Sequence, residues 1–175
     1  MNSANFKIVL AGDEAVGKTC LIRRLIKDTF SQDYKPTLGF EILLHQMQIK
    51  SVPINFVIWD IAGQTAFESV RQSYYKDSRG FLLVFNLGNR VTLRNLEYWV
   101  AEIKESCPTA PFVMLGNKVD LPEHKVTEGE MKQMAQKLGA IDSIFTSAKT
   151  GQGVIEAFTL LGTAILRQFE EKTIQ

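Results

Sequence analysis

The sequence predicts an α/β fold in which a six-stranded, mainly parallel sheet is covered by helices on both faces. Short apolar runs alternate along the chain with segments whose apolar residues recur at helical spacing. Polar motifs follow several of the runs, at the strand ends where such sheets bind ligands. We expect a single domain over residues 1–175, because this length suffices for one core and no repeat or linker interrupts it.

Six apolar runs are the expected strands, the second and third forming an antiparallel pair: residues 6–11, 40–50, 55–60, 81–85, 112–115 and 141–145. Helical spacing marks four segments: 20–26, 93–103, 131–138 and 154–165. Thr127 and Glu130 have the spacing of a capping box before the third of these helices. The polar segment 28–39, which contains Pro36 and Gly39, is long enough to be a functional loop.

The composition is that of an ordinary globular protein, with 45% apolar and 22% charged residues. The net charge of +1 indicates neither a nucleic-acid partner nor an acidic-lipid surface. Two cysteines, Cys20 and Cys107, are too few for a disulfide framework, so we expect a reducing, intracellular and cytoplasmic location. No apolar run has transmembrane length, and no signal-peptide core is found. We expect a monomer.

The strongest motif reads G-x-x-x-x-G-K-T and consists of Gly12, Asp13, Glu14, Ala15, Val16, Gly17, Lys18 and Thr19. It lies between an expected strand and an expected helix. Gly12 and Gly17 let the backbone approach an anion, and its N–H groups converge at the positive end of the helix dipole. Lys18 can reach the β- and γ-phosphates, and the Thr19 hydroxyl can bind Mg²⁺. The alternative is a glycine-rich turn with a solvated lysine, but the strand–helix context favours a P-loop NTPase.

A second motif, residues 60–64, follows the strand that ends at Trp59. The Asp60 carboxylate can hold Mg²⁺ directly or through a water. Gly63 offers a backbone N–H to a γ-phosphate, and Gln64 can orient a water for in-line attack. An ordinary strand that ends in aspartate before a glycine turn would have the same sequence. The presence of the phosphate loop favours the Mg²⁺ and γ-phosphate site over this alternative.

Two further motifs point to the base of a nucleotide. Asp120, in Asn117-Lys118-Val119-Asp120, can accept hydrogen bonds from guanine N1–H and the 2-amino group. Adenine lacks this donor pair and would leave the carboxylate unpaired. The short motif is also compatible with a polar turn, but it follows an expected strand. The second of these motifs, Ser147-Ala148-Lys149, follows the sixth strand, where the Ala148 N–H can reach guanine O6. Taken alone, this short motif is weak evidence for a nucleotide site.

From about Phe6 to Phe169, these motifs have the order and spacing of the Ras superfamily of small GTPases, which the chain resembles. Within it, Tyr74-Tyr75 and the run 83–85 look most like the Rab group. The resemblance implies a GTP/GDP switch with Mg²⁺ and slow intrinsic GTP hydrolysis, acting in membrane trafficking or related signalling. It implies switch segments at residues of about 31–40 and 61–76. An exchange factor, an activating protein and effectors would bind through residues 31–42 and 61–76.

The resemblance also assigns roles. Thr37 would bind Mg²⁺ through its hydroxyl and the γ-phosphate through its N–H, and Phe30 and the Lys118 stem would pack against the base. The catalytic residues would be Lys18, Thr37, Gly63 and Gln64, and the metal ligands Thr19, Thr37 and Asp60. The nucleotide contacts would be Gly12, Asp13, Glu14, Ala15, Val16, Gly17, Lys18, Thr19, Cys20, Phe30, Tyr34, Thr37, Gly63, Asn117, Lys118, Asp120, Ser147, Ala148 and Lys149.

The chain departs from the Rab pattern at Ile61 and at residues 38–42 and 65–68, all on the expected partner-facing segments. These changes leave the nucleotide chemistry intact and leave partner identity open. Glu14 replaces a small residue; it either points to solvent or obstructs an arginine arriving from an activating protein. No cysteine follows Glu170, so membrane attachment through prenylation is not readable here.

Three functions remain in view: a regulated GTP hydrolase, a nucleotide-bound interaction module with little useful turnover, and a P-loop ATPase or kinase. The presence of Lys18, Thr37, Asp60 and Gln64 favours turnover over the interaction module. Asn117 and Asp120 disfavour the adenine-specific classes.

Overall fold

The computed structural model describes residues 4–33, 35–63 and 68–173. Its strands form one six-stranded sheet in the order β2-β3-β1-β4-β5-β6. β2 pairs antiparallel with β3, whereas the other neighbours pair in parallel. The six-stranded, mainly parallel sheet that the alternating pattern predicted is therefore confirmed.

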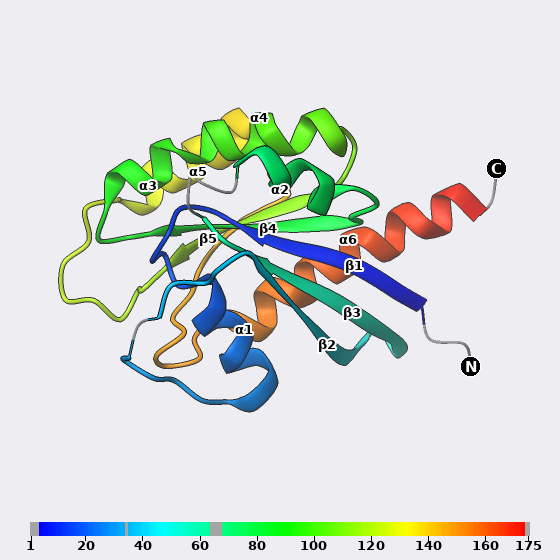
Figure 1. Cartoon of the computed structure of the whole chain (residues 1–175), viewed down its shortest axis with the longest axis horizontal. Coiled ribbons are helices and arrows are strands. Elements are labelled where there is room, and N and C mark those ends of the chain that lie inside the picture. The colour runs from blue at the N-terminus through cyan, green and yellow to red at the C-terminus, as the bar shows by residue number, and fades with distance from the viewer. Residues whose placement is uncertain (1–3, 34, 64–67, 174–175) are drawn as a thin grey trace.

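The elements follow one another from strand to helix along most of the chain (Figure 1). The strands are β1 (Ala4–Ala11), β2 (Phe40–Ile49), β3 (Val52–Ile61), β4 (Gly80–Asn86), β5 (Phe112–Asn117) and β6 (Ser143–Phe145). The helices are α1 (Lys18–Lys27), α2 (Glu68–Tyr75), α3 (Arg90–Arg94), α4 (Leu96–Ser106), α5 (Glu128–Leu138) and α6 (Val154–Thr173).

Two apolar cores flank the sheet because successive strand residues point to opposite faces. Along β1, Ile8 and Leu10 pack in the core beneath α1 and α6, and Val9 packs in the core beneath α3, α4 and α5. Figure 1 shows α1 and α6 on one face and α2 to α5 on the other. The helices thus cover both faces, as predicted.

Helix boundaries differ from the sequence pattern in two places. The expected helix 93–103 is two helices, α3 and α4, that meet at Asn95. The interruption is slight, because Asn95 keeps a right-handed helical backbone and its carbonyl accepts a bond from the Trp99 N–H at 3.2 Å. The apolar pattern did not indicate α2, since its buried side chains are those of Arg71 and Tyr75.

The start of α5 and the start of β6 can also be compared with the sequence pattern. The capping box of α5 is present: Thr127 Oγ1 accepts from the Glu130 N–H at 3.2 Å, and the Thr127 N–H donates to Glu130 Oε2 at 2.8 Å. The sixth strand is shorter than expected and begins at Ser143. Ile141 is exposed because the chain is still turning after Gly139, whose left-handed conformation ends α5.

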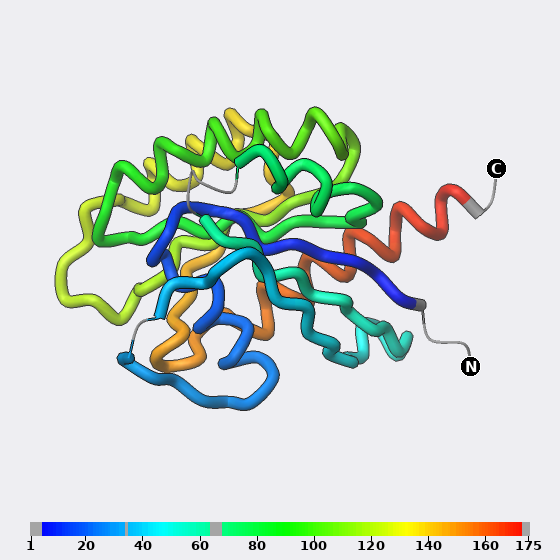
Figure 2. The backbone as a smooth tube through the Cα atoms, in the orientation of Figure 1, coloured from blue at the N-terminus to red at the C-terminus, as the bar shows by residue number. Residues whose placement is uncertain are grey.

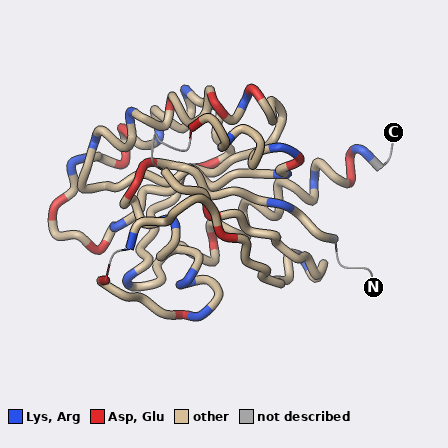
Figure 3. Tube along the Cα trace, in the orientation of Figure 1, with Lys and Arg blue, Asp and Glu red and all other residues tan. Residues whose placement is uncertain are grey.

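Different parts of the chain lie at the two ends of the molecule (Figure 2). Both termini lie at one end, and the loops after β1, β5 and β6 gather at the other. Acidic and basic residues are interspersed along the trace (Figure 3), in keeping with a net charge of +1. Within the described ranges, no helix is both long enough and apolar enough to cross a membrane.

Candidate functional site

A cavity of about 340 Å³ opens where the predicted motifs meet, at the carboxyl ends of the parallel strands. Residues of the phosphate loop, the loop 28–39 and the segments after β3, β5 and β6 line it. The lining includes these predicted residues: Glu14, Ala15, Gly17, Lys18, Thr19, Cys20, Phe30, Thr37, Gly63, Asn117, Lys118, Asp120, Ala148 and Lys149. The fold therefore brings most of the predicted site together.

The glycines of the phosphate loop are required by both conformation and space. Gly12 and Gly17 have φ values of 143° and 103°, where side chains are disfavoured. A Cβ atom at Gly12 would lie 2.2 Å from the Val84 carbonyl oxygen, and one at Gly17 would lie 2.4 Å from Asn117 Nδ2. Gly17 is also the N-cap of α1 and makes no side-chain cap, so the N–H groups of the first turn face an anion site.

Lys18 lies beneath the loop, buried. Its Nζ donates to the carbonyls of Gly12 at 2.8 Å and Asp13 at 2.7 Å. Burial lowers the pKa of Lys18 to about 8, although the charges of Asp60, Asp13 and Glu14 act in the opposite direction. The loop therefore holds a cation that anionic phosphates would stabilise.

Thr19, Thr37 and Asp60 form a compact group of oxygen atoms. Thr19 Oγ1 donates to Asp60 Oδ2 at 2.5 Å and lies 2.8 Å from Thr37 Oγ1. The Asp60 side chain is 1% exposed, and its buried Oδ1 has no hydrogen-bond partner among the described residues. Burial raises the pKa of this carboxyl, against the opposing effects of the Thr19 hydrogen bond and the Lys18 charge.

This group fits Mg²⁺, a cation that prefers oxygen ligands and usually takes only one or two carboxylates from a protein. An orphaned carboxylate oxygen beside two hydroxyl groups is a suitable partial ligand set. In the described ranges there is no cluster of three or more His, Cys, Asp or Glu side chains that could form a separate metal centre. The remaining ligands would have to come from water or phosphate.

The opposite end of the cavity is built from the motifs after β5 and β6. Asn117 is buried; its Nδ2 donates to the Val16 carbonyl at 2.8 Å, and its Oδ1 accepts from Thr146 Oγ1 at 3.1 Å. Lys118 Nζ donates to the Ala15 carbonyl at 2.9 Å. Asn117 and Lys118 therefore connect the two ends of the site.

Asp120 is placed by its neighbour in the next motif. The Ser147 hydroxyl donates to Asp120 Oδ1 at 2.6 Å and accepts from the Thr150 N–H at 3.0 Å. Ser147 is itself fully buried, so it acts on the site by orienting Asp120. One oxygen of Asp120 is held in this way at the cavity wall.

Arg24 of α1 is a supporting residue that the sequence did not indicate. Its Nε donates to the Ala148 carbonyl at 2.8 Å, and its Nη2 donates to the Lys149 carbonyl at 2.7 Å. These bonds attach the loop after β6 to α1. No local motif marks this role, because Ala148 is 124 positions away along the chain.

Residues 7–167 match the family model described as the Ras family. This chain belongs to the Ras family. It is 39% identical over 155 residues to the Ras-related protein RABA6b of Arabidopsis thaliana, covering 87% of this chain and 67% of that protein. It is 33% identical over 162 residues to Rab-13 of Rattus norvegicus, covering 92% and 80%. The GTP-binding protein RHO1 of Candida albicans is 35% identical over 180 residues, covering 95% and 90%.

The expected resemblance to the Ras superfamily is thus confirmed, and Rab-named proteins are among the relatives. Membership supports a GTP-binding switch in trafficking or signalling, with GTP or GDP as ligand and Mg²⁺ generally expected. Two predicted site residues of this Ras-family protein, Tyr34 and Gln64, lie outside the described residues.

Gly63 brings the segment after β3 against the phosphate loop. A Cβ atom at this position would lie 2.5 Å from the Gly12 carbonyl oxygen and 2.7 Å from the Glu14 backbone nitrogen. The neighbouring Ala62 N–H donates to the Gly39 carbonyl at 2.9 Å, which joins this segment to the end of the loop 28–39. The two segments and the phosphate loop therefore meet at one point of this Ras-family protein.

Four of the expected nucleotide contacts lie behind the cavity wall: Gly12, Asp13, Val16 and Ser147. Gly12 and Val16 offer carbonyl groups to Lys18 and Asn117. The carboxylate of Asp13 turns away from the cavity toward α4. These residues shape the loop from behind.

Proposed function

We propose that this Ras-family protein is a GTP/GDP switch that hydrolyses GTP slowly by itself and acts in membrane trafficking or related signalling. The observation that carries the proposal is the group formed by Thr19, Thr37 and Asp60. It joins the phosphate loop, the first switch loop and the end of β3 at an oxygen-rich site with one unpaired carboxylate oxygen.

At the phosphate end, the N–H groups of the loop and Lys18 would hold the β- and γ-phosphates. Mg²⁺, held by the hydroxyls of Thr19 and Thr37 and the carboxylate of Asp60, would neutralise charge on these phosphates. The Gly63 N–H would donate to the γ-phosphate, and Gln64 would orient the attacking water.

At the base end, we propose that Asp120 selects guanine by accepting from N1–H and the 2-amino group. The hydrogen bond from Ser147 uses one lone pair of Oδ1, so Oδ2 and the second lone pair of Oδ1 remain for the two N–H groups of the base. The Ala148 N–H would donate to O6, while Phe30 and the Lys118 stem, both in the cavity wall, would pack against the ring. An adenine base would leave Asp120 unpaired, at a cost that supports discrimination.

The switch itself would follow from Thr37 and Gly63. Both would lose their contacts when the γ-phosphate leaves, so the segments 31–42 and 61–76 would be ordered by GTP and released in the GDP state. We propose that an exchange factor, an activating protein and effectors distinguish the two states through these segments.

Slow turnover is expected because no arginine is available in the first switch loop. Tyr34, Lys35 and Pro36 precede Thr37 where such an arginine would lie. Without a stabilising arginine, Ras-type hydrolysis proceeds at a rate on the order of 10⁻⁴ to 10⁻³ s⁻¹.

The test is to identify the co-purified nucleotide and then to follow single-turnover release of phosphate from bound GTP over hours. The expected result is a guanine nucleotide, Mg²⁺-dependent release in the range given above, and slower release after Gln64→Leu. Retention of intact GTP would instead favour an interaction module. A co-purified adenine nucleotide would indicate an ATPase or kinase. Hydrolysis on the order of one per second without a partner would contradict the proposed slow turnover.

A further inference from the structure

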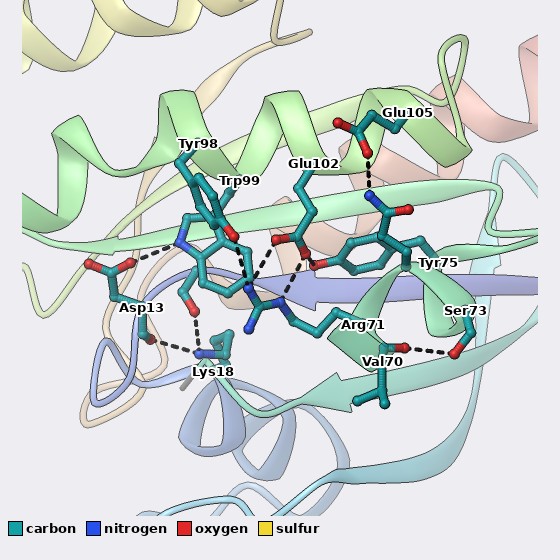
Figure 4. A network of polar contacts seen from close by, with 12 residues as sticks. Asp13, Lys18, Val70, Arg71, Ser73, Tyr75, Tyr98, Trp99, Glu102 and Glu105 are labelled. Carbon is teal, nitrogen blue, oxygen red and sulfur yellow. Dashed lines mark hydrogen bonds and ion pairs between the residues drawn. The ribbon is translucent and has the colours of Figure 1, made fainter. Parts of the chain in front are cut away.

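The carboxylate of Asp13 attaches the phosphate loop to the helix layer above it (Figure 4). Trp99 Nε1 donates to Asp13 Oδ1 at 2.8 Å, and Asn95 Nδ2 donates to Asp13 Oδ2 at 2.7 Å. Both donors lie at or beyond the junction of α3 and α4. The same residue accepts Lys18 Nζ at its backbone carbonyl, at 2.7 Å. Asp13 therefore joins Lys18 to α4.

One turn along α4, Glu102 binds the second switch segment. Arg71 of α2 donates through Nε to Glu102 Oε1 and through Nη2 to Oε2, each at 2.9 Å, and the Tyr75 hydroxyl donates to Oε1 at 2.7 Å. Arg71 is 1% exposed and Glu102 6%. Burial alone would raise the pKa of Glu102, but the hydrogen bonds from Arg71 and Tyr75 lower it. The pair is ionised and bidentate.

Trp99 connects these two sets of contacts. The guanidinium carbon of Arg71 lies 4.4 Å from the centroid of the Trp99 ring, so the indole meets Arg71 with its face and Asp13 with its N–H edge. Figure 4 shows the tryptophan between the arginine and the aspartate. A continuous path of contacts therefore runs from α2 through Trp99 to the phosphate loop.

The structure shows this path with Arg71 docked on Glu102. A buried guanidinium that leaves its carboxylate leaves a buried charge unpaired, so we expect Arg71 to undock only together with α2. When Arg71 is docked, it packs on the indole and fixes the direction of the Trp99 N–H. Without Arg71, the indole would lose the cation that packs on its face, and its hydrogen bond to Asp13 would be held less firmly.

We propose that Trp99 is a positioning residue that couples the docking of α2 on α4 to the phosphate loop, so that the docked state slows nucleotide release. The coupling rests on the proposed function in that the cavity must hold a guanine nucleotide, but it does not require hydrolysis. Any change that undocks Arg71 then loosens Asp13 and the loop around Lys18.

The experiment measures the dissociation of fluorescently labelled GDP in excess Mg²⁺, together with the melting temperature of each variant. Trp99→Phe removes the N–H donor but keeps a ring for Arg71. Arg71→Lys keeps a cation but loses the planar fork that binds both oxygens of Glu102. Ile103→Val is the matched control, because it removes a methyl group from the buried face of α4 outside the path.

The expected result is that Trp99→Phe and Arg71→Lys each accelerate GDP release by about tenfold, as the loss of a hydrogen bond to a charged group would do. The double variant releases GDP no more than about twofold faster than either single variant, because the path is already broken. Ile103→Val lowers the melting temperature but leaves release unchanged.

Three outcomes overturn the coupling: release within about twofold of the parent in both single variants, effects that multiply in the double variant, or release that follows melting temperature in all variants including the control. If the parent retains no guanine nucleotide, the proposed function fails. Hydrogen exchange of residues 12–19 then decides the coupling separately, since Arg71→Lys must raise it and unchanged exchange excludes the path.

Discussion

At the scale of single residues, Lys18 shows that burying a charge beneath the phosphate loop carries a cost in stability. Its pKa is lowered from 10.5 to about 8, chiefly by burial. The unfolded chain therefore binds this proton more tightly, and the lowered pKa opposes folding by about 3 kcal/mol at pH 7. Because the folded pKa is the lower one, the penalty is complete below about pH 8 and disappears as the pH rises toward 10.5.

Lys18→Met is the variant that separates stability from binding. Removing the buried ammonium relieves about 3 kcal/mol but leaves carbonyls of Gly12 and Asp13 without a donor, at about 1–3 kcal/mol. We therefore expect the free energy of unfolding of the nucleotide-free variant in urea at pH 7 to lie between that of the parent and about 2 kcal/mol above it. The parent should gain stability over the variant between pH 8 and 10.

The same variant should lose the stabilisation that GDP and Mg²⁺ give to the parent. Lys27→Met is the control, because Lys27 is exposed at the end of α1 and should leave that stabilisation intact. A Lys18→Met protein that GDP still stabilises as strongly as the parent would contradict the role of Lys18 in phosphate binding.

Asp120→Asn should change the base preference of the site from guanine to xanthine. The Ser147 hydroxyl can still donate to the new amide oxygen, so the side chain should keep its place. Its amide then faces the base with a donor, which suits the 2-oxo group of xanthine and conflicts with the 2-amino group of guanine. Competition between GTP and xanthosine triphosphate measures the change, and an unaltered preference for GTP would exclude Asp120 as the base reader.

The placement of most residues that a local motif encodes could be predicted from the sequence. The phosphate-loop glycines and Asp60 are examples, because their chemistry depends on adjacent residues and on strand ends. The direction of the Asp13 carboxylate could not be predicted, since its partner Trp99 is 86 positions away. The same holds for Arg24, which supports the loop after β6 from a helix early in the chain.

At the scale of elements, Thr37 and Gly39 attach the end of the loop 28–39 to the phosphate loop and to the segment after β3. Thr37 contacts Thr19 through the two hydroxyls, and the Gly39 carbonyl accepts from Ala62. Thr37→Ala removes the hydroxyl from the group around Asp60. We therefore expect faster hydrogen exchange across residues 31–40 with a bound GTP analogue, while Thr29→Ala, at an exposed position of the same loop, leaves exchange unchanged.

Equal protection of residues 31–40 in Thr37→Ala and in the parent would show that another contact holds this loop. A melting curve of each variant completes the comparison, because a loop that unfolds locally changes exchange without changing global stability.

The helices α5 and α2 differ in how well the local sequence predicts them. The α5 helix begins at a capping box, which satisfies its first N–H groups with two side chains three positions apart. The α2 helix has no comparable signal, because its buried positions are the polar residues Arg71 and Tyr75. Arg71 can be a core residue there because Glu102, which belongs to another helix, pairs with its charge.

At the scale of the whole molecule, the alternation of strands and helices predicted the layers but not the order of the sheet. Period-two alternation determines which face each side chain covers, as Ile8 and Val9 show in the two cores. The alternation does not indicate which strands lie next to each other in the sheet. The pairing of β1 with both β3 and β4 joins segments far apart along the chain.

Binding of an activating protein would also involve the whole molecule. Glu14 is the residue that we expect to affect the hydrolysis stimulated by such a partner. Glu14 is exposed and lines the cavity, and its backbone nitrogen lies where a Cβ at Gly63 would clash. We propose that a carboxylate there would add negative charge next to a triphosphate and would occupy space that an arginine from a partner would need. Such an arginine accelerates this chemistry by about 10³ to 10⁵.

We expect Glu14→Gly to leave GDP release nearly unchanged, because the anion-binding N–H groups do not depend on this side chain. Hydrolysis stimulated by an activating protein should rise at least about tenfold, a small part of what a well-placed arginine supplies. Glu14→Ala serves as the second variant, since it removes the carboxylate without adding backbone freedom. Single-turnover hydrolysis with and without the activator checks both. If both variants hydrolyse GTP at the parent rate in each condition, Glu14 points to solvent and does not hinder an arriving arginine.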